Sequence, residues 1–302
     1  MKKIKVNNVT QKKRLDHYLV QKLHQSRSYI NQLLNQKLVS VDGVVAQKNG
    51  QWVDNDTIIG IAELKSNTIQ SLSNKIKLKI VYEDNDLIVI NKPKNIIVHP
   101  TSFNETNTIV NILYKKIRTK DFPDSVRPGI VHRLDKDTTG LLVIAKNKKT
   151  YLALIKQIAD RILVRKYLAL VHHNFNDKFL LLKLPIARSK QNKLKMVVSD
   201  EPNAKPAQTE VIVLENYPQG SLIECKLLSG RTHQIRVHMA YIHHPIFNDE
   251  LYGTYDGYKN YGQFLHAYYL SFIHPITGNL MEFQIKPDNI FNKLKIKLRG
   301  DK

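Results

Sequence analysis

The sequence has little or none of what several classes of protein require. It contains a single cysteine in 302 residues, which excludes an internal disulfide and a cluster of thiolate metal ligands. No apolar run approaches the roughly 18 residues that span a bilayer, and the basic N-terminus lacks the apolar segment of a signal peptide. We therefore expect a soluble cytoplasmic protein without a membrane-spanning segment, with Cys225 as a small core residue.

Motifs for common cofactors are also missing. There is no P-loop, no GxGxxG dinucleotide loop and no HExxH zinc motif, and no GxSxG elbow of a serine hydrolase. The sequence has 12 histidines, but His233 and His238 point to different sides of either a strand or a helix. The adjacent His243 and His244 also diverge. The sequence therefore predicts an activity without a metal or another cofactor.

Acidic residues are scarce relative to basic ones. Forty-seven Lys and Arg face 26 Asp and Glu, which gives a formal net charge of +21. This excess indicates a polyanionic partner, with nucleic acid as the first candidate and an anionic membrane surface as the second. Because Lys, Asn and Ile are all plentiful, a biased genome composition is an alternative source of part of the charge.

The first sixty residues predict a compact unit of two helices and a hairpin. Asp42 and Gly43 lie between apolar alternations, which is a strong hairpin signal, and residues 52–61 predict another strand. The two predicted helices each have one apolar face, the first through Leu15, Tyr18, Leu19 and Leu23, and the second, capped by Ser26, through Ile30, Leu33 and Leu34.

The remainder of the chain predicts a larger domain rich in strands. Residues 63–76 lose periodicity and gain Ser and Asn, which is typical of a linker. From residue 77 on, strands dominate, with a turn at Asp84 and Asn85 and an amphipathic helix within residues 108–117. Many strands with few helices predict an α+β class with a mixed, largely antiparallel sheet. The predicted organisation is a small domain over residues 1–62, a linker over 63–76 and a second domain over 77–302.

Charged residues gather at the edges of apolar segments in the second domain. The stretch "GIVHRLDKDTTGLLVIAK" (residues 129–146) carries HRLDKD between segments that resemble buried strands, and "VRKY" and "SGRTHQIRVHM" are similar. Arg231 and Arg236 lie in a segment apolar enough to be buried, where an arginine requires an acidic partner or a phosphate. Asp135 is a plausible partner, although a structural ion pair or a solvated turn also explains these residues.

Together, these segments resemble one family in content and order. "LIVINKP" with "VHP" (87–100), "HRLDKDTTGLLVIAK" (132–146), "RKYLALV" (165–171), "GRTHQIRVHMAYIHHPIFND" (230–249) and "LHAYYLSFIHP" (265–275) are similar to the RluA-type pseudouridine synthases. The resemblance covers essentially the whole chain. Thr139 replaces a frequent Ser, and Asn95 and Asn248 stand where many members have Gly. Because Asn tolerates the left-handed backbone of Gly, these departures are mild.

The N-terminal unit resembles the S4 RNA-binding module. The similarity covers residues 14–60, with Arg14, Arg27 and Lys37 between the predicted elements. It implies that these three cations contact RNA. A small α+β domain with ordinary surface cations is the alternative.

The family resemblance implies a chemistry for the charged segments. Asp135 would be the catalytic carboxylate, and Arg236 would pair with it and aim it. Tyr167 would stack on the uracil. It could also assist proton removal, but only if its pKa, ordinarily near 10, is shifted.

The same resemblance implies a set of substrate contacts. Arg133 would fill the stack vacated by a flipped uridine, and Ile235 would pack against the uracil ring. Arg231 and His233 would complete the substrate-binding residues. The neighbouring residues are predicted to shape the turn; they are His132, Lys136 and Asp137.

The resemblance implies a cofactor-free isomerisation of specific uridines to pseudouridine in large-subunit (23S) ribosomal RNA or a pre-ribosomal particle. The enzyme would act as a monomer and without a membrane partner. The residues alone leave two other classes open, a non-catalytic S4-type RNA-binding protein and an RNA hydrolase that uses His and Lys. They also leave open which uridines are modified. Whether Asp135 attacks the base, attacks the ribose or abstracts a ribose proton is equally open.

Overall fold

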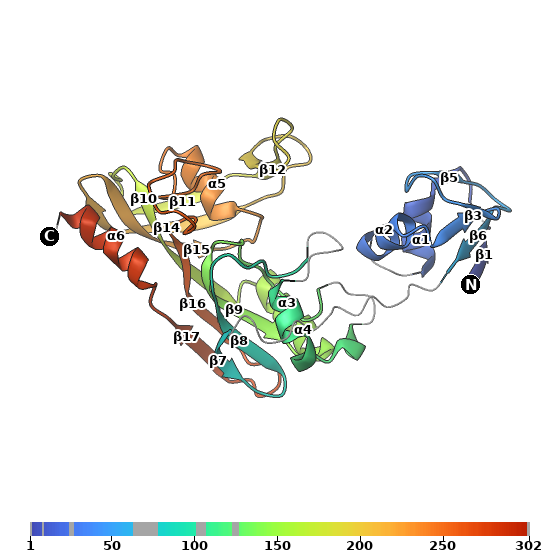
Figure 1. The fold of residues 1–302 in the computed structure, drawn as a ribbon, viewed down its shortest axis with the longest axis horizontal. Coiled ribbons are helices and arrows are strands. Elements are labelled where there is room, and N and C mark those ends of the chain that lie inside the picture. The colour runs from blue at the N-terminus through green and yellow to red at the C-terminus, as the bar shows by residue number, and fades with distance from the viewer. Residues whose placement is uncertain are drawn as a thin grey trace. The chain divides into compact units, whose positions relative to one another are not determined.

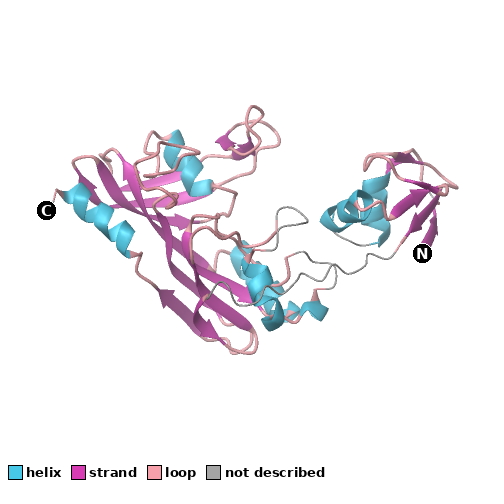
Figure 2. Ribbon diagram, viewed as in Figure 1, coloured by secondary structure: helices cyan, strands magenta, loops and turns pink. Residues whose placement is uncertain are grey.

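The computed structural model describes residues 2–7, 9–23, 27–62, 78–100, 107–122 and 127–300. The chain divides into two compact units, one formed mainly by residues 1–70 and a larger one formed by most of residues 71–302; their elements are drawn in Figures 1 and 2. Within the described ranges, every helix is too short or too polar to cross a membrane. The predicted cap Ser26 and the predicted linker, residues 63–76, lie outside the described residues.

The N-terminal unit packs two helices against a small antiparallel sheet. The helices are α1 (Leu15–Leu23) and α2 (Arg27–Asn35). The sheet runs in the order β1 (Lys2–Lys5), β6 (Ile58–Ile61), β3 (Val39–Val41) and β4 (Val44–Val45), while β2 (Lys13–Arg14) pairs with β5 (Trp52–Val53). The apolar helix faces predicted from the sequence are confirmed, because one core contains Leu15, Tyr18, Leu19, Ile30, Leu33 and Leu34, with Leu23 packed against it.

Two tight turns determine where strands of this unit begin and end. Asp42 and Gly43 have φ values of 49° and 85°, which suit the tight turn between β3 and β4, so the predicted hairpin is confirmed. The single strand predicted over residues 52–61 is wrong. Asp56 adopts φ 68°, and Asp54 N donates to Thr57 Oγ1 at 3.1 Å, so a turn separates β5 from β6.

In the larger unit, nine strands of the described residues form one sheet. All its neighbouring strands are antiparallel except β9 and β16. This confirms the α+β class with a mixed, largely antiparallel sheet. The order is β11 (Phe179–Lys183), β14 (Gln208–Tyr217), β15 (Gly220–Leu227), β10 (Val164–His172), β16 (Leu265–Ile273), β9 (Thr139–Ala145), β8 (Leu87–Lys92) and β7 (Lys79–Glu83), with β17 (Leu280–Gln284) beside β16.

Helices and a small hairpin complete the larger unit. The amphipathic helix predicted within 108–117 is present as α3, whose cap Thr108 accepts from Asn111 N at 3.3 Å, and it continues as a 3-10 turn. The sequence did not predict the helices α4 (Lys148–Ala159) and α6 (Asn289–Arg299). The elements are α3 (Ile109–Leu113), η1 (Tyr114–Lys116), η2 (Thr119–Asp121), α4 (Lys148–Ala159), β12 (Ile186–Arg188), β13 (Met196–Val198), α5 (Gln234–Tyr241) and α6 (Asn289–Arg299).

The contact between β9 and β16 depends on Gly140. Its φ is +116°, and a Cβ atom there would lie 2.3 Å from the carbonyl oxygen of Ala267, so only glycine fits. Ala267 pairs with Gly140 on one side and with Tyr167 of β10 on the other. The loop that precedes Gly140 in the sequence is therefore fixed beside the middle of β10.

Three smaller expectations concern backbone and burial. Asn95 and Asn248 have φ values of 62° and 58°, so the predicted left-handed backbone is confirmed at both. Cys225 is completely buried, as expected of a core residue. The expectation of a strand on each side of HRLD is wrong, because the preceding segment contributes only an isolated bridge from Ile130 to Ile144 of β9.

Candidate active site

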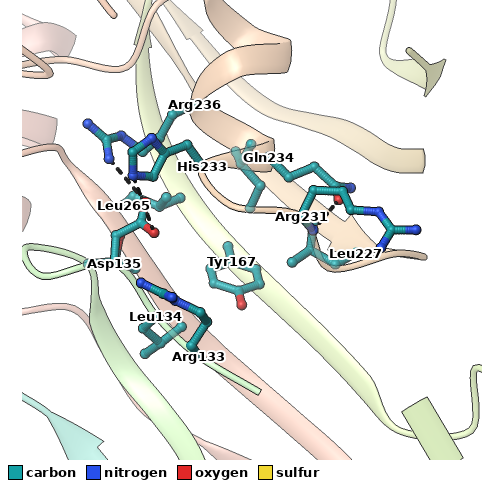
Figure 3. Close-up of a pocket in the computed structure, with 12 residues that line it drawn as sticks. Arg133, Leu134, Asp135, Tyr167, Leu227, Arg231, His233, Gln234, Arg236 and Leu265 are labelled. Atoms are coloured by element: carbon teal, nitrogen blue, oxygen red, sulfur yellow. Dashed lines mark hydrogen bonds and ion pairs between the residues drawn. The ribbon is translucent and has the colours of Figure 1, made fainter. Parts of the chain in front are cut away.

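Asp135 lies in a loop that is tied to its surroundings on two sides. Lys92 Nζ donates to the carbonyl oxygen of Lys136 at 2.8 Å, and Gln263 Nε2 donates to Thr138 Oγ1 at 2.8 Å. The loop closes through Thr138 N, which donates to the carbonyl oxygen of Asp135 at 3.2 Å. The Asp135 side chain is 16% exposed and faces a pocket (Figure 3).

Lys92 is a completely buried cation at the end of β8. Its Nζ also donates to the carbonyl oxygens of Pro93 at 2.8 Å and Ile96 at 2.9 Å. Burial lowers the pKa of Lys92 to about 7, against the opposing charges of Asp137 and Asp135. Lys92 therefore joins the end of a core strand to the loop that carries Asp135.

Arg236 of α5 pairs with two carboxylates. Its NH1 donates to Asp135 Oδ2 at 3.1 Å, while Nε and NH2 donate to Asp249 at 2.7 and 2.8 Å. Burial lowers the pKa of Arg236, but the hydrogen bonds and charges of Asp249 and Asp135 raise it above its ordinary value. The pairing of Arg236 with Asp135 was predicted from the sequence. The completely buried side chain of Asp249 was not.

His233 approaches the other oxygen of Asp135. It stands in the left-handed conformation before α5, with Nε2 3.9 Å from Asp135 Oδ1. Burial lowers its pKa, so the ring is neutral near pH 7. The Tyr252 hydroxyl lies 2.8 Å from His233 Nδ1 and accepts from Met196 N at 2.7 Å. If the hydroxyl donates to Nδ1, the ring proton is on Nε2 and faces Asp135.

Tyr167 presents a buried ring to the same pocket. It lies on β10 beside an irregularity in the pairing with β16, where Tyr268 of β16 is skipped while the pairing of β10 with β15 stays regular. Burial raises the pKa of Tyr167 to about 12, with Arg165 lowering it and Asp135 raising it. This is opposite to the shift on which the predicted assistance in proton removal depended. The phenol therefore stays protonated near neutral pH.

Arg133 is exposed at the mouth of the pocket and oriented by a histidine. Its NH1 lies 3.2 Å from His99 Nε2, and His99 Nδ1 lies 3.1 Å from the carbonyl oxygen of Pro100. Burial, with smaller effects from Arg127 and Arg133, lowers the pKa of His99 to about 4. A neutral ring donates from Nδ1 to Pro100 and accepts from Arg133 at Nε2.

Two further predicted contacts differ in exposure. Ile235 is buried at the start of α5 and lines the pocket with Asp135. Arg231 also lines the pocket but is exposed, so the expectation that it is buried is wrong. Its Nε donates to the carbonyl oxygen of Pro206 at 3.0 Å, which holds the side chain at the rim.

A basic cavity of about 670 Å³ adjoins this pocket. Its size suits a ligand as large as a nucleotide. Among the described residues that line it, Asp135 is the acidic one. The lining arginines are Arg127, Arg133, Arg161, Arg165 and Arg231.

The cations predicted to bind RNA in the N-terminal unit differ in their contacts. Arg14 is exposed, and its Nε and NH2 donate to Asp16 at 3.1 and 3.0 Å. Lys37 is exposed between α2 and β3, with φ 58°. Arg27 begins α2, and its side chain lies outside the described part of the chain.

Other polar residues of the loop have structural contacts. His132 Nε2 accepts from Val143 N at 3.3 Å, and burial lowers its pKa to about 3. Asp137 packs against Gly262, where a Cβ atom would lie 2.3 Å from its own Cβ. These contacts agree with the turn-shaping role predicted for both residues.

One cluster has the composition of a metal site. Candidate ligand atoms of Asp84, Asp86 and His274 lie within 4.8 Å of one another. Asp84 Oδ1 already accepts from Asp86 N and Leu87 N at 2.7 and 2.8 Å, and His274 Nε2 lies 2.8 Å from Asp84 Oδ2. These hydrogen bonds stabilise the turn between β7 and β8. None of the three residues lines the pocket or the cavity of Asp135.

Sequence reasoning missed several residues of the site. Asp249, Tyr252 and His99 lie in irregular segments whose contacts only the fold creates. Arg165 could have been found from the sequence. Residues two apart on a strand share a face, so Arg165 lies on the same face as Tyr167, which had already been selected.

Comparisons with known proteins show which families the two parts of the chain match. The family model described as RNA pseudouridylate synthase matches residues 86–241, and the S4 domain model matches residues 13–58. An uncharacterised RNA pseudouridine synthase of Mycoplasma pneumoniae is 38% identical over 94% of this chain and 92% of its own length. A ribosomal large subunit pseudouridine synthase D of Nitrosomonas europaea is 39% identical over 89% of this chain and 79% of its own length.

A solved structure shows the same fold. The human RNA pseudouridylate synthase domain containing 4 matches with a TM-score of 0.57 and 26% identity, over 73% of this chain and 93% of that chain. The chain therefore belongs to the RNA pseudouridylate synthase family, and it is an RNA pseudouridine synthase with an S4 domain. The resemblance inferred from the sequence is confirmed.

Proposed function

We propose that this enzyme converts specific uridines of large-subunit ribosomal RNA to pseudouridine, with Asp135 as the catalytic carboxylate. The relatives named ribosomal large subunit pseudouridine synthase D support the substrate class. One observation carries the catalytic assignment. Among the described residues that line the arginine-rich cavity, Asp135 is the only one with a carboxylate.

The reaction breaks the bond between N1 of uracil and C1′ of ribose and forms a bond from C5 to C1′. C5 loses a proton and N1 gains one, so the product has the composition of the substrate and no redox partner is needed. Attack on the base, attack on the ribose and abstraction of a ribose proton all require an ionised carboxylate. Arg236 balances that charge and aims one oxygen, at 3.1 Å, while the second oxygen lies 3.9 Å from Nε2 of His233, another residue that lines the pocket.

The surrounding residues suit an extruded base. We assign Tyr167 and Ile235 to the two faces of the detached uracil, since both are buried and line the pocket. Arg133, oriented by His99, would fill the position that the uridine leaves in the RNA stack. His233 would donate from Nε2 toward Asp135 or the base, and Arg231 would contact the RNA at the rim.

The organisation of the chain supports a division of labour. We take residues 1–62 as the S4 module, 63–76 as a linker and 77–302 as the catalytic domain, in a monomer. The module would increase affinity for the RNA or a pre-ribosomal particle through cations such as Arg14, Arg27 and Lys37. The chemistry would remain in the catalytic domain.

Mapping pseudouridines in the ribosomal RNA of a strain that lacks this protein tests the proposal. We expect specific sites in large-subunit RNA to be absent and to reappear when the wild-type protein is restored. Unchanged pseudouridines in that RNA would refute the substrate class. Purified protein incubated with a transcript should leave the RNA length unchanged, and shortened RNA would instead indicate a hydrolase.

A further inference from the structure

Arg165 is a buried cation for which the described part of the chain provides no ion-pair partner. It is 6% exposed, and its Nε is completely buried with no hydrogen-bond partner among the described residues. No described carboxylate forms an ion pair with its guanidinium, whereas Arg236 is matched by two. Burial therefore lowers the pKa of Arg165. An unpaired buried charge costs several kcal/mol, so its presence points to an anion supplied by a ligand.

His132 and Tyr167, which interact electrostatically with Arg165, carry no negative charge near pH 7. His132, whose pKa is lowered partly by Arg165, is neutral, and Tyr167 remains a protonated phenol near pH 7. Gly230 approaches the guanidinium so closely that a Cβ atom there would lie 3.1 Å from NH1. Arg165 lines the large cavity together with Arg161, Arg127 and Asp135. The cavity side is therefore where an anion can reach it.

The position of Arg165 indicates where the anion would lie relative to the reacting base. Arg165 and Tyr167 are two residues apart on β10, both buried on the same face of the strand, so their Cα atoms are roughly 6.6 Å apart. A uridine that stacks on Tyr167 would bring an adjacent phosphate near Arg165. The guanidinium fork matches the oxygens of a phosphate.

We propose that Arg165 binds one phosphodiester of the RNA beside the flipped uridine. The proposal rests on the proposed function, because it takes an RNA uridine as the occupant of the pocket. The bound phosphate supplies the missing counterion and fixes the nucleotide while uracil is detached. Arg165 is then a binding residue that was selected at the expense of the stability of the free protein.

Neutral phosphate analogues test the assignment directly. The probe is a synthetic RNA stem-loop containing a uridine that the wild-type protein converts, with a single methylphosphonate placed in turn at each linkage near that uridine. We expect one linkage at which removal of the charge weakens wild-type binding about 10- to 100-fold. Arg165→Met should bind the unmodified RNA equally weakly and be indifferent to that methylphosphonate. Arg165→Lys should recover part of the affinity.

Stability distinguishes this role from a structural one. Arg165→Met should melt at or above the wild-type temperature, because it removes an unpaired buried charge. Arg299→Ala, which removes an exposed partner of Glu215, is the control and should keep the wild-type response to every methylphosphonate. A lower melting temperature combined with an unchanged methylphosphonate response would assign Arg165 to the structure and overturn the proposal.

A catalytic alternative gives a different result. If Arg165 instead stabilised an ionised Tyr167, Arg165→Met would lower kcat, leave RNA affinity unchanged and respond to methylphosphonates like the wild type. That outcome overturns the phosphate site while leaving the proposed function intact. If the wild-type protein converts no uridine in any large-subunit RNA, the proposed function fails and the phosphate site fails with it.

Discussion

Arg236 and Asp249 form a forked ion pair, with Nε to Oδ2 at 2.7 Å and NH2 to Oδ1 at 2.8 Å. Asp249 is completely buried and lies outside the cavity. The pair fixes the plane of the guanidinium, so that NH1 is directed at Asp135. The geometry of the proposed catalytic carboxylate therefore depends on a residue that we do not expect to touch the substrate.

We predict that Asp249→Asn lowers both stability and turnover. An amide cannot accept both hydrogen bonds of the fork, which leaves a buried charge poorly paired, at a cost of about 3–5 kcal/mol. Misaiming of Arg236 should reduce kcat about 100-fold. Denaturant unfolding and pseudouridine formation measure the two effects.

The matched control is Glu201→Gln, which breaks an exposed pair with Lys190. It should change the free energy of unfolding by no more than about 0.5 kcal/mol and leave kcat unchanged. If Asp249→Asn behaves like this control, Asp249 does not position Arg236.

Near neutral pH, the rate of the chemical step should not follow ionisation of Tyr167. Its pKa is raised to about 12 by burial, so between pH 7 and 9 the protonated phenol dominates. If phenolate were the base, kcat would rise about tenfold per pH unit over this range. We expect a flat profile for both the wild type and Tyr167→Phe in single-turnover assays. A unit slope present in the wild type and absent from Tyr167→Phe would restore the base role.

Local patterns predicted the parts of the fold that depend on a few neighbouring residues. Asp42 and Gly43 indicated a turn, because few residues adopt left-handed backbone at low cost. The left-handed backbone at Asn95 and Asn248 was expected from the family resemblance, because many members have Gly at these positions. Asn248 does more than replace glycine, since its side chain donates to the carbonyl oxygens of Tyr258 and Gly262 at 3.0 Å.

Properties that depend on tertiary contacts were missed or wrong. The apolar context of Arg231 predicted burial, but the side chain lies along the rim against Pro206. Asp249 follows a segment whose path the sequence does not specify, so its pairing with Arg236 was not predicted. Arg165 was not selected from the sequence, although it lies two residues before Tyr167 in "VRKY". That no described carboxylate pairs with Arg165 became evident only from the structure.

Lys37 should contribute to RNA affinity in a salt-dependent manner. It is exposed in the N-terminal unit, and each phosphate contact adds about 0.7 to 0.9 to the slope of log K against log salt. We expect Lys37→Ala to reduce the slope by roughly one contact and to leave kcat at saturating RNA unchanged. Lys297→Ala in α6 is the control, for which we expect the wild-type slope. Equal slopes for Lys37→Ala and the wild type would remove Lys37 from the RNA-binding surface.

Activity should survive exhaustive chelation and dialysis. The site of Asp135 is dominated by Arg133, Arg231 and Arg236, whose positive charge disfavours a divalent cation there. Pseudouridine formation should therefore proceed at the wild-type rate in EDTA, with RNA folding maintained by monovalent salt. Loss of turnover that a divalent ion restores, without a change in RNA structure, would contradict this prediction.

Asp135→Asn provides the most direct test of the account. The substitution preserves size and part of the hydrogen bonding to Arg236 but removes the anion that each possible mechanism requires. Asp137→Asn is the matched control, because Asp137 packs against Gly262 and does not line the cavity; we expect it to retain substantial activity. The decisive measurement is pseudouridine formed per folded protein molecule, detected by carbodiimide and primer extension, with folding checked by thermal melting and RNA binding by filter retention. The account predicts a folded, RNA-binding Asp135→Asn protein that forms no detectable pseudouridine, and near-normal turnover by that protein would contradict it.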